Sequence, residues 1–118
     1  MYKPPFLFRG PTRFPHFQAS IAKLEEESKD QDGLNFTIAI NYGSRDEICR
    51  AVKKIVAEGI VSEDITEQVI SDHLDTAGIP DPDLLIRTSG ELRLSNYLMW
   101  QLAYTEFYFT DVPWPDFN

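Results

Sequence analysis

Two arginines and a serine follow a short apolar run, and their side chains are suited to binding an anion. The run is residues 84–86, Leu-Leu-Ile, with turn residues on both sides. It is typical of a strand buried on both faces, although three residues alone could also anchor a loop. Arg87 stands where that strand would end, and Arg93 and Ser95 follow in a polar loop. Guanidinium forks and a hydroxyl are donors for a phosphorylated ligand.

The elements around these residues suit an anion. Ser95 and Asn96 are candidate N-caps for a helix over residues 97–103. Ligands of open α/β sheets bind beyond the carboxyl ends of strands, and the first turn of a helix offers unpaired N–H groups. The ordinary alternative stays open. Arg87 could pair with Glu91 or Asp83, and Arg93 could be a solvated loop residue.

The stretch from Asp83 to Phe117 resembles, without a gap, the C-terminal signature of the cis-prenyltransferases. These are isoprenyl transferases of the undecaprenyl diphosphate synthase type. Residues 41–47, Asn-Tyr-Gly-Ser-Arg-Asp-Glu, resemble a second segment of that family, which normally has two glycines. The similarity is clear over residues 34–117. It implies that residues 1–118 form a single partial domain, the C-terminal part of the undecaprenyl diphosphate synthase fold.

The resemblance implies condensation of isopentenyl diphosphate with an allylic diphosphate, with Mg²⁺, forming Z double bonds. Arg87, Arg93 and Ser95 fall on the family's isopentenyl-diphosphate-binding positions, and Glu106 falls on an acidic position linked with Mg²⁺. No catalytic residue is carried over. The expected partners are the two diphosphates, a second copy in a homodimer of the full-length protein, and a membrane surface contacted through the lipid product.

Several departures from the family pattern indicate a fragment. The family's Asp-Gly-Asn-Gly-Arg-like loop, which binds Mg²⁺ and the allylic diphosphate, has no counterpart in residues 1–33. Leu92 stands where His is frequent, and the glycine after the Arg-Thr pair is displaced to Gly90. The chain also stops before the family's final helix. We expect a C-terminal half, trimmed at both ends, that keeps the isopentenyl diphosphate half-site and is inactive alone.

Two other functions are compatible with the sequence. The chain could be a non-catalytic partner subunit of a prenyltransferase complex, since some family members support a catalytic partner without an allylic site. It could also be a generic phosphate-binding α/β module, but the missing glycine-rich loop disfavours that reading. From the residues alone, the interpretation of Glu106 as a rim residue is favoured over a role in binding Mg²⁺. In one parallel sheet Glu106 and Arg87 lie at opposite edges, unless the last strand runs otherwise or a second subunit joins the edges.

The composition indicates the size of the domain and excludes several classes of protein. The 118 residues suffice for one compact domain, and 42% hydrophobic with 13% aromatic residues suit a globular core. A net charge of −8 disfavours non-specific nucleic-acid binding. The single Cys49 excludes an internal disulfide framework and a Cys/His metal cluster. No apolar run reaches membrane-spanning length, and no signal-peptide pattern is present, so we expect a cytoplasmic location.

Strands that alternate with helices predict an α/β fold with a mainly parallel sheet and flanking helices. About four strands are expected, at residues 6–8, 35–42, 84–86 and 107–109. A helix entered near Pro15 carries an apolar face of Phe17, Ile21 and Leu24. A second begins with a Ser44–Glu47 capping box and ends at Gly59. A third is capped by Ser62 and closes at Gly78.

The remaining candidates each have a functional and a structural interpretation. Arg45 and Asn41 could border the ligand cleft, or Arg45 could pair with Asp46 or Glu47 near the helix cap. Cys49 is expected to pack rather than react, and His16 and His73 to lie at the surface. The aromatic residues could line a prenyl tunnel or simply pack in a core; these are Tyr97, Trp100, Tyr104, Phe107, Tyr108 and Phe109. The predicted buried stripe of the second helix is Ile48, Val52, Ile55 and Val56.

Overall fold

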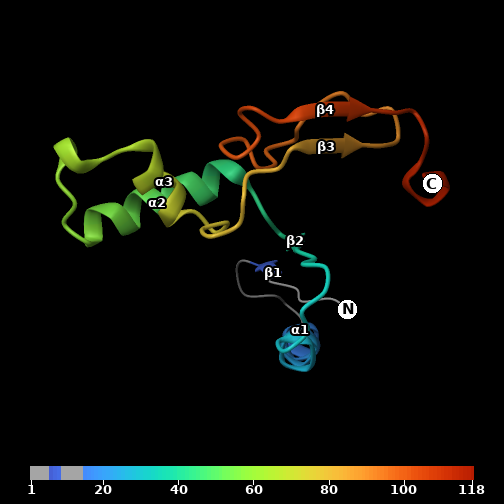
Figure 1. Ribbon diagram of the computed structural model, residues 1–118, viewed down its shortest axis with the longest axis horizontal. Coiled ribbons are helices and arrows are strands. Elements are labelled where there is room, and N and C mark those ends of the chain that lie inside the picture. The colour runs from blue at the N-terminus through green and yellow to red at the C-terminus, as the bar shows by residue number, and fades with distance from the viewer. Residues whose placement is uncertain (1–5, 9–14) are drawn as a thin grey trace. The chain divides into compact units, whose positions relative to one another are not determined.

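The computed structural model describes residues 6–8 and 15–118 of the chain (Figure 1). It divides into two compact units, residues 1–42 and 43–118, which are described separately below. The helices and strands, in chain order, are β1 (Phe6–Phe8), α1 (Pro15–Ser28), β2 (Ile38–Ile40), α2 (Ser44–Ala57), α3 (Glu67–His73), β3 (Leu84–Arg87) and β4 (Glu106–Phe109). The expectation of a single partial domain over residues 1–118 stays a prediction.

The first unit is a helix that connects two parallel strands. β1 pairs with β2 in parallel, with Phe6 opposite Ile38 and Phe8 opposite Ile40. A parallel pair needs a crossover, and α1 provides it. The predicted apolar face of α1 is confirmed, because a cavity of about 210 Å³ between helix and strand is lined by Phe17, Ser20, Ile21, Leu24, Ile38 and Ile40. β2 is shorter than the strand predicted over residues 35–42.

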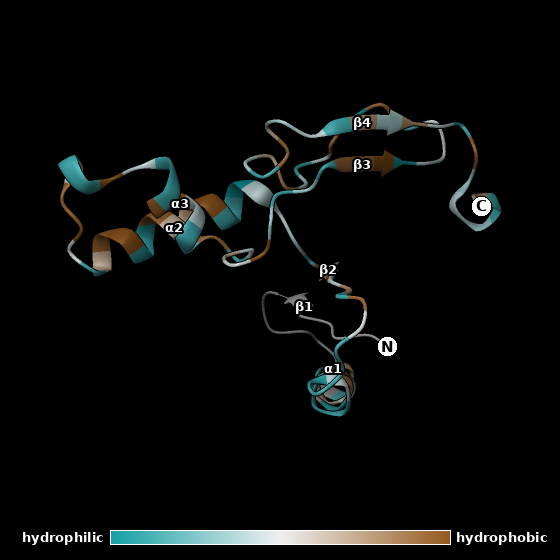
Figure 2. Ribbon diagram, in the orientation of Figure 1, coloured by the Kyte–Doolittle hydropathy of each residue, from teal (hydrophilic) through white to brown (hydrophobic). Residues whose placement is uncertain are grey.

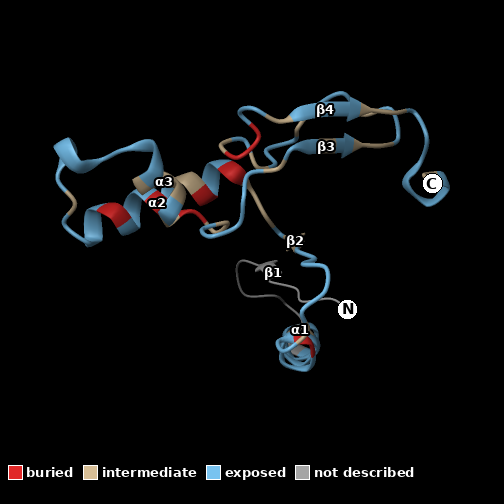
Figure 3. Cartoon of the chain, viewed as in Figure 1, coloured by how far each residue is buried: buried red, intermediate tan, exposed pale blue. Residues whose placement is uncertain are grey.

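In the second unit, α2 buries a face different from the predicted apolar stripe. Its buried residues are Ser44, Glu47, Ala51 and Ile55, drawn in red in Figure 3. Val52 and Val56 are 49% and 70% exposed, so the prediction was wrong for both. The reason is that the buried face of α2 makes polar contacts with residues 75 and 96–101, which a search for apolar spacing does not detect. The helix ends as expected before Gly59, which has a φ of +74°.

The third predicted helix is shorter than the sequence indicates. Residues Ser62–Asp64 form a 3₁₀ turn, and α3 begins only at Glu67. Its N-cap is Thr66, whose side-chain oxygen accepts a hydrogen bond from the Val69 N–H at 3.1 Å. The prediction of Ser62 as the cap was wrong, because Ser62 starts a separate short turn. α3 is followed by Leu74, which is buried.

β3 and β4 form a parallel two-stranded ladder. Leu84 lies opposite Glu106, and Arg87 lies opposite Phe109. The hydropathy colouring shows that β3 is largely hydrophobic (Figure 2), yet Leu84 is 53% and Ile86 is 43% exposed. The prediction of a strand buried on both faces was therefore wrong for this chain, because the alternate side chains of β3 reach solvent while Leu85 is half-buried.

The fold class is α/β with parallel strand pairs, as predicted. The part of the chain that the structure describes contains four strands, and each end lies within three residues of the expected position. None of its helices has both the length and the apolar content that a membrane crossing requires.

Candidate functional site

The loop that follows β3 is fixed by hydrogen bonds to the segment that follows β4. The Thr110 N–H donates to the Arg87 carbonyl at 3.0 Å, and the Gly90 N–H donates to the Thr110 carbonyl at 2.9 Å. Ser89 and Gly90 have φ values of +64° and +71°, which turn the chain sharply. Only glycine adopts this conformation without strain, and a Cβ at Gly90 would lie 3.2 Å from Asp111 Oδ1. The polar loop is thus anchored where Arg87 leaves the sheet.

Arg87 and Arg93 differ in their partners. Arg87 is half-buried, and no hydrogen bond or ion pair joins its guanidinium to another residue in the described part of the chain. Arg93 is exposed, and its Nη1 lies 2.5 Å from Glu91 Oε2. The alternative of an Arg87–Glu91 pair is therefore wrong, since Glu91 pairs with Arg93 instead. A half-buried guanidinium without a partner retains its capacity to bind an anion.

The helix predicted over residues 97–103 does not form. The chain makes turns there, with φ values of +51°, +63° and +44° at Ser95, Asn96 and Leu98. The Met99 N–H, which would be unpaired in the first turn of such a helix, donates instead to Ser44 Oγ at 2.9 Å. Ser95 is exposed and is not a helix cap. The unpaired N–H groups of a helix start are therefore not available to bind an anion here. Only the side chains of the loop could do so.

The predicted capping box at the start of α2 is also wrong. Gly43 is the N-cap and makes no side-chain cap bond, while Ser44 lies inside the first turn. The cap comes from a distant residue, because Asn96 Oδ1 accepts a hydrogen bond from the Arg45 N–H at 2.9 Å. The predicted Arg45–Asp46 ion pair is replaced by one between Arg50 Nε and Asp46 Oδ2 at 3.0 Å.

A buried polar cluster that the sequence analysis missed joins α2 to two other segments. Glu47 is 1% exposed; its Oε2 accepts from the Asp75 N–H at 2.8 Å, and its Oε1 accepts from Gln101 Nε2 at 3.0 Å. Gln101 Nε2 also donates to Thr76 Oγ1 at 2.9 Å. Arg50 donates to the Asp75 carboxylate through both terminal guanidinium nitrogens, Nη1 at 2.5 Å and Nη2 at 2.6 Å. The cluster fixes the positions of Gln101 and Asp75 relative to α2.

Glu106 lies at the other end of the ladder from Arg87. It begins β4 opposite Leu84, and its N–H donates to the Asp83 carbonyl at 3.1 Å. Three residues of strand separate the level of Leu84 from that of Arg87, about 10 Å at about 3.3 Å per residue. The sequence left the direction of β4 open, and the structure shows it to be parallel.

The separation of Glu106 from Arg87 determines whether the two could share one Mg²⁺ ion. A Mg²⁺ ion binds oxygens at about 2.0–2.1 Å and is usually held by one or two carboxylates together with substrate phosphates. The residues of one chain do not fit an ion shared between Glu106 and a diphosphate at Arg87, because the two lie at opposite strand ends. Among the described residues, no group of three or more His, Cys, Asp or Glu side chains forms a metal site.

The other candidates have definite positions. His73 Nε2 lies 2.8 Å from Glu58 Oε2, and His73 Nδ1 lies 2.6 Å from the Val69 carbonyl. The hydrogen bond to Glu58, followed by that to Val69, raises the pKa of His73 above its usual value. Cys49 is exposed, so the expectation that it packs was wrong.

The aromatic residues do not share one environment. Tyr104 is 98% exposed, so the described residues do not enclose its side chain. Trp100 Nε1 donates to Ser71 Oγ at 3.1 Å, and the rings of Phe107 and Phe109 meet edge to face with centroids 6.0 Å apart. Burial raises the pKa of the Tyr97 phenol. These contacts favour ordinary packing for Trp100 and Phe109.

Solved structures with the same fold define the class of protein. The chain is similar to a lavandulyl diphosphate synthase from Lavandula x intermedia in complex with dimethylallyl diphosphate, with a TM-score of 0.88 and 40% identity over 99% of this chain and 52% of that one. It is also similar to a probable undecaprenyl diphosphate synthase from Campylobacter jejuni, with a TM-score of 0.86 and 31% identity over 99% of this chain and 54% of that one. The fold is that of the prenyl diphosphate synthases of this type.

Residues 12–118 match the family described as "Putative undecaprenyl diphosphate synthase", and the chain belongs to that family. It is 58% identical to the isoprenyl transferase of Halalkalibacterium halodurans, over 87% of this chain and 42% of that protein. It is 56% identical to the isoprenyl transferase of Staphylococcus saprophyticus, over 84% and 41% respectively. The chain thus spans about 42% of the length of the first of these relatives. The recognition of the family from residues 34–117 is confirmed.

Proposed function

We propose that this chain carries the isopentenyl-diphosphate half-site of a cis-prenyltransferase, an enzyme that transfers prenyl groups from an allylic diphosphate to isopentenyl diphosphate. The observation that supports this most directly is Arg87. Its guanidinium is half-buried at the carboxyl end of β3 and is engaged by no other described residue. Arg93 and Ser95 follow in the same anchored loop, within a chain that belongs to the undecaprenyl diphosphate synthase family.

The energies favour an anion over the existing contact of Arg93. Its ion pair with Glu91 joins side chains that are 68% and 40% exposed, and such surface pairs contribute about 0–1 kcal/mol. A charge-assisted hydrogen bond to a diphosphate oxygen contributes about 1.5–3 kcal/mol. The diphosphate therefore displaces Glu91 at little cost, and the Arg93 fork becomes available to it. Arg87 needs no such exchange.

A calorimetric titration with isopentenyl diphosphate tests the half-site. We expect Arg87→Ala and Arg93→Ala each to weaken binding by about 10- to 150-fold, the equivalent of one charge-assisted contact. Lys53→Ala is the matched control, because it removes one positive charge from the exposed side of α2. Equal affinities for the parent and the two arginine variants would contradict the proposal.

Catalysis belongs, on this proposal, to an assembly larger than this chain. The family's loop for the allylic diphosphate has no counterpart in residues 1–33, and Glu106 lies at the other end of the β3–β4 ladder from Arg87. We expect no prenyl transfer when the purified chain is mixed with both diphosphates and Mg²⁺, and detection of product would contradict this. The homodimer, the membrane contact through the lipid product and the cytoplasmic location stay predictions for the whole protein, to be checked by sedimentation and cell fractionation.

A second candidate function is a non-catalytic partner subunit. The exposed apolar side chains of the β3–β4 ladder favour it, because such surfaces mark sites of association. They are Leu84, Ile86, Phe107 and Tyr108. Co-expression with a full-length synthase distinguishes the two functions. A partner subunit elutes in a stable complex, whereas separate elution of the two proteins rules this candidate out.

A further inference from the structure

Asn96 completes the N-terminus of a helix that lies 51 positions away in sequence. Its Oδ1 accepts a hydrogen bond from the Arg45 N–H at 2.9 Å, and its backbone carbonyl accepts one from the Ser44 N–H at 2.8 Å. The first N–H groups of a helix have no partner within the helix, so these two bonds satisfy donors that would otherwise need water. The approach is close, since a Cβ at Gly43 would lie 2.9 Å from Asn96 Nδ2.

In a third hydrogen bond the loop provides the donor, and a fully buried side chain of α2 provides the acceptor. Ser44, which is 0% exposed, accepts a hydrogen bond through its Oγ from the Met99 N–H at 2.9 Å. Residues 96–99 are therefore held against the first turn of α2 at both ends. Ser95 directly precedes this segment, and Arg93 lies two residues before Ser95.

The backbone of the loop needs such support. Ser95 and Asn96 have φ values of +51° and +63°, in the left-handed region. Asn visits that region comparatively readily, but Ser does so much less. Non-glycine residues stay in such conformations when surrounding contacts hold them, and they cluster at ligand sites. The Tyr97 N–H donates to the Leu94 carbonyl at 3.2 Å and closes the turn around Ser95 and Asn96. The bonds of Asn96 to α2 hold this turn against the helix.

We propose that Asn96 is a positioning residue, which holds Arg93 and Ser95 in the conformation that receives the diphosphate. This inference rests on the proposed function of the half-site. Both acceptors of Asn96, its Oδ1 and its backbone carbonyl, bond to α2. Asn96 therefore affects the binding of the diphosphate by holding the loop in place. Losing the Oδ1 bond lowers the population of the receiving conformation, and the apparent affinity falls by the same factor. For one neutral hydrogen bond that factor is about 2- to 12-fold, the equivalent of about 0.5–1.5 kcal/mol.

Asn96→Gly is the test variant, because glycine keeps the positive φ without strain and removes the Oδ1 acceptor. Thr66→Gly is the matched control. It deletes a capping side chain of the same kind, the acceptor for the Val69 N–H, at the start of α3. Titration with isopentenyl diphosphate should show binding about 2- to 12-fold weaker for Asn96→Gly and unchanged for Thr66→Gly. Thermal unfolding of both variants checks that a loss of folding is not the cause.

A mutant cycle separates positioning from general destabilisation. If Asn96 acts through Arg93 and Ser95, then Asn96→Gly weakens binding less in a background that carries both Arg93→Ala and Ser95→Ala than in the parent. Equal factors in both backgrounds, or equal affinities of the parent and Asn96→Gly, overturn the role of Asn96 while leaving the half-site intact. A parent chain that does not bind isopentenyl diphosphate overturns the proposed function itself, and the positioning role with it.

Discussion

Glu106 and Arg87 lie at opposite ends of one parallel ladder, where Glu106 faces Leu84 and Arg87 faces Phe109. A carboxylate at one end of two paired strands does not serve the same ligand oxygen as a guanidinium at the other end. We predict that joint action of the two on one ligand involves a second chain, which would bring the opposite ends together.

From this separation we predict that Glu106→Ala changes the affinity for isopentenyl diphosphate by less than about twofold in the absence of Mg²⁺. At that distance the carboxylate contributes less than about 0.4 kcal/mol to the binding free energy. Calorimetry in the presence of a chelator measures it, with Arg87→Ala as the variant that loses affinity. A drop for Glu106→Ala as large as that for Arg87→Ala would show that Glu106 reaches the diphosphate within one chain.

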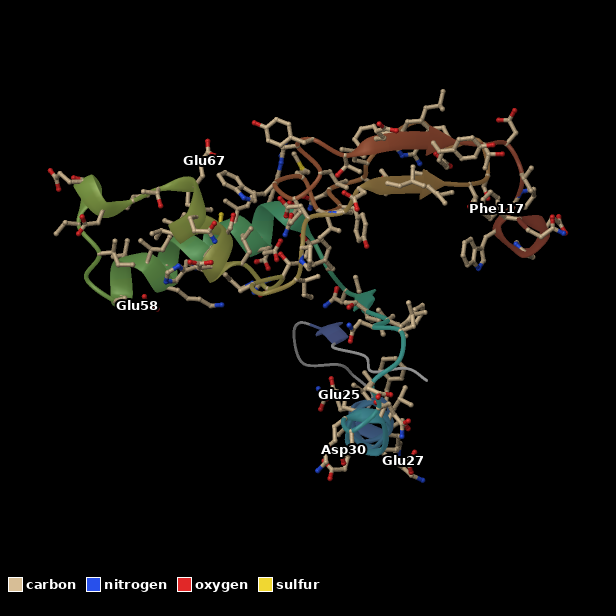
Figure 4. All side chains as sticks on the ribbon, viewed as in Figure 1. Glu25, Glu27, Asp30, Glu58, Glu67 and Phe117 are labelled. Atoms are coloured by element: carbon tan, nitrogen blue, oxygen red, sulfur yellow. The ribbon has the colours of Figure 1, made fainter. Side chains whose placement is uncertain are left out.

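The Glu47 carboxylate should be a main determinant of stability. It accepts hydrogen bonds from the Asp75 N–H and from Gln101 Nε2 while 1% exposed. Glu47→Ala leaves both donors without this acceptor, and we expect a loss of about 3 kcal/mol or more in the free energy of unfolding, from two charge-assisted bonds. Urea unfolding measures it. Glu67→Ala, at the exposed start of α3 (Figure 4), should cost less than about 1 kcal/mol. Similar losses for the two variants would contradict the role of Glu47.

His73 should make the stability of the α2–α3 contact depend on pH. The two ring nitrogens lie near two acceptors, the Val69 carbonyl and the carboxylate of Glu58, which is labelled in Figure 4. The cationic ring, with an N–H on each nitrogen, can donate to both, whereas the neutral ring can donate to only one. Because these hydrogen bonds raise the pKa of His73 in the folded state, the stabilisation is fully present below the usual value of about 6.5. It is lost as the pH rises through the folded-state pKa.

We therefore expect the free energy of unfolding to fall as the pH rises above about 6.5, and Glu58→Gln to reduce that fall by weakening the acceptor. Urea unfolding at several pH values compares the parent with the variant. The same pH dependence in both proteins would show that the Glu58 contact is not responsible.

Cys49 should react in the folded protein. Its thiol is exposed on α2 rather than packed against a neighbour. A maleimide reagent should modify it without denaturant at a rate within about tenfold of the rate in urea, since exposure controls access to the thiolate. Protection by orders of magnitude in the absence of urea would show that the thiol is buried.

The local patterns of the sequence determined the elements of this protein and its family. Phe17, Ile21 and Leu24 recur at helical spacing and form the face of α1 toward β2, and the run that ends in Arg87 forms β3. Such patterns depend on residues within one or two turns or on alternation along one strand, so they are legible without neighbours in space. The signature over residues 83–117 identified the undecaprenyl diphosphate synthase family for the same reason, and the family match confirms it.

The tertiary structure alone decided what the polar side chains do. The helix predicted after Asn96 gives way to turns because Asn96 and Met99 bond to Ser44, more than 50 positions away in sequence. For the same reason, Glu47 accepts hydrogen bonds from the Asp75 N–H and from Gln101 Nε2 and does not form the predicted capping box. A polar group satisfies its hydrogen bonds with whichever partner the folded chain brings near, and that partner is not encoded in local spacing.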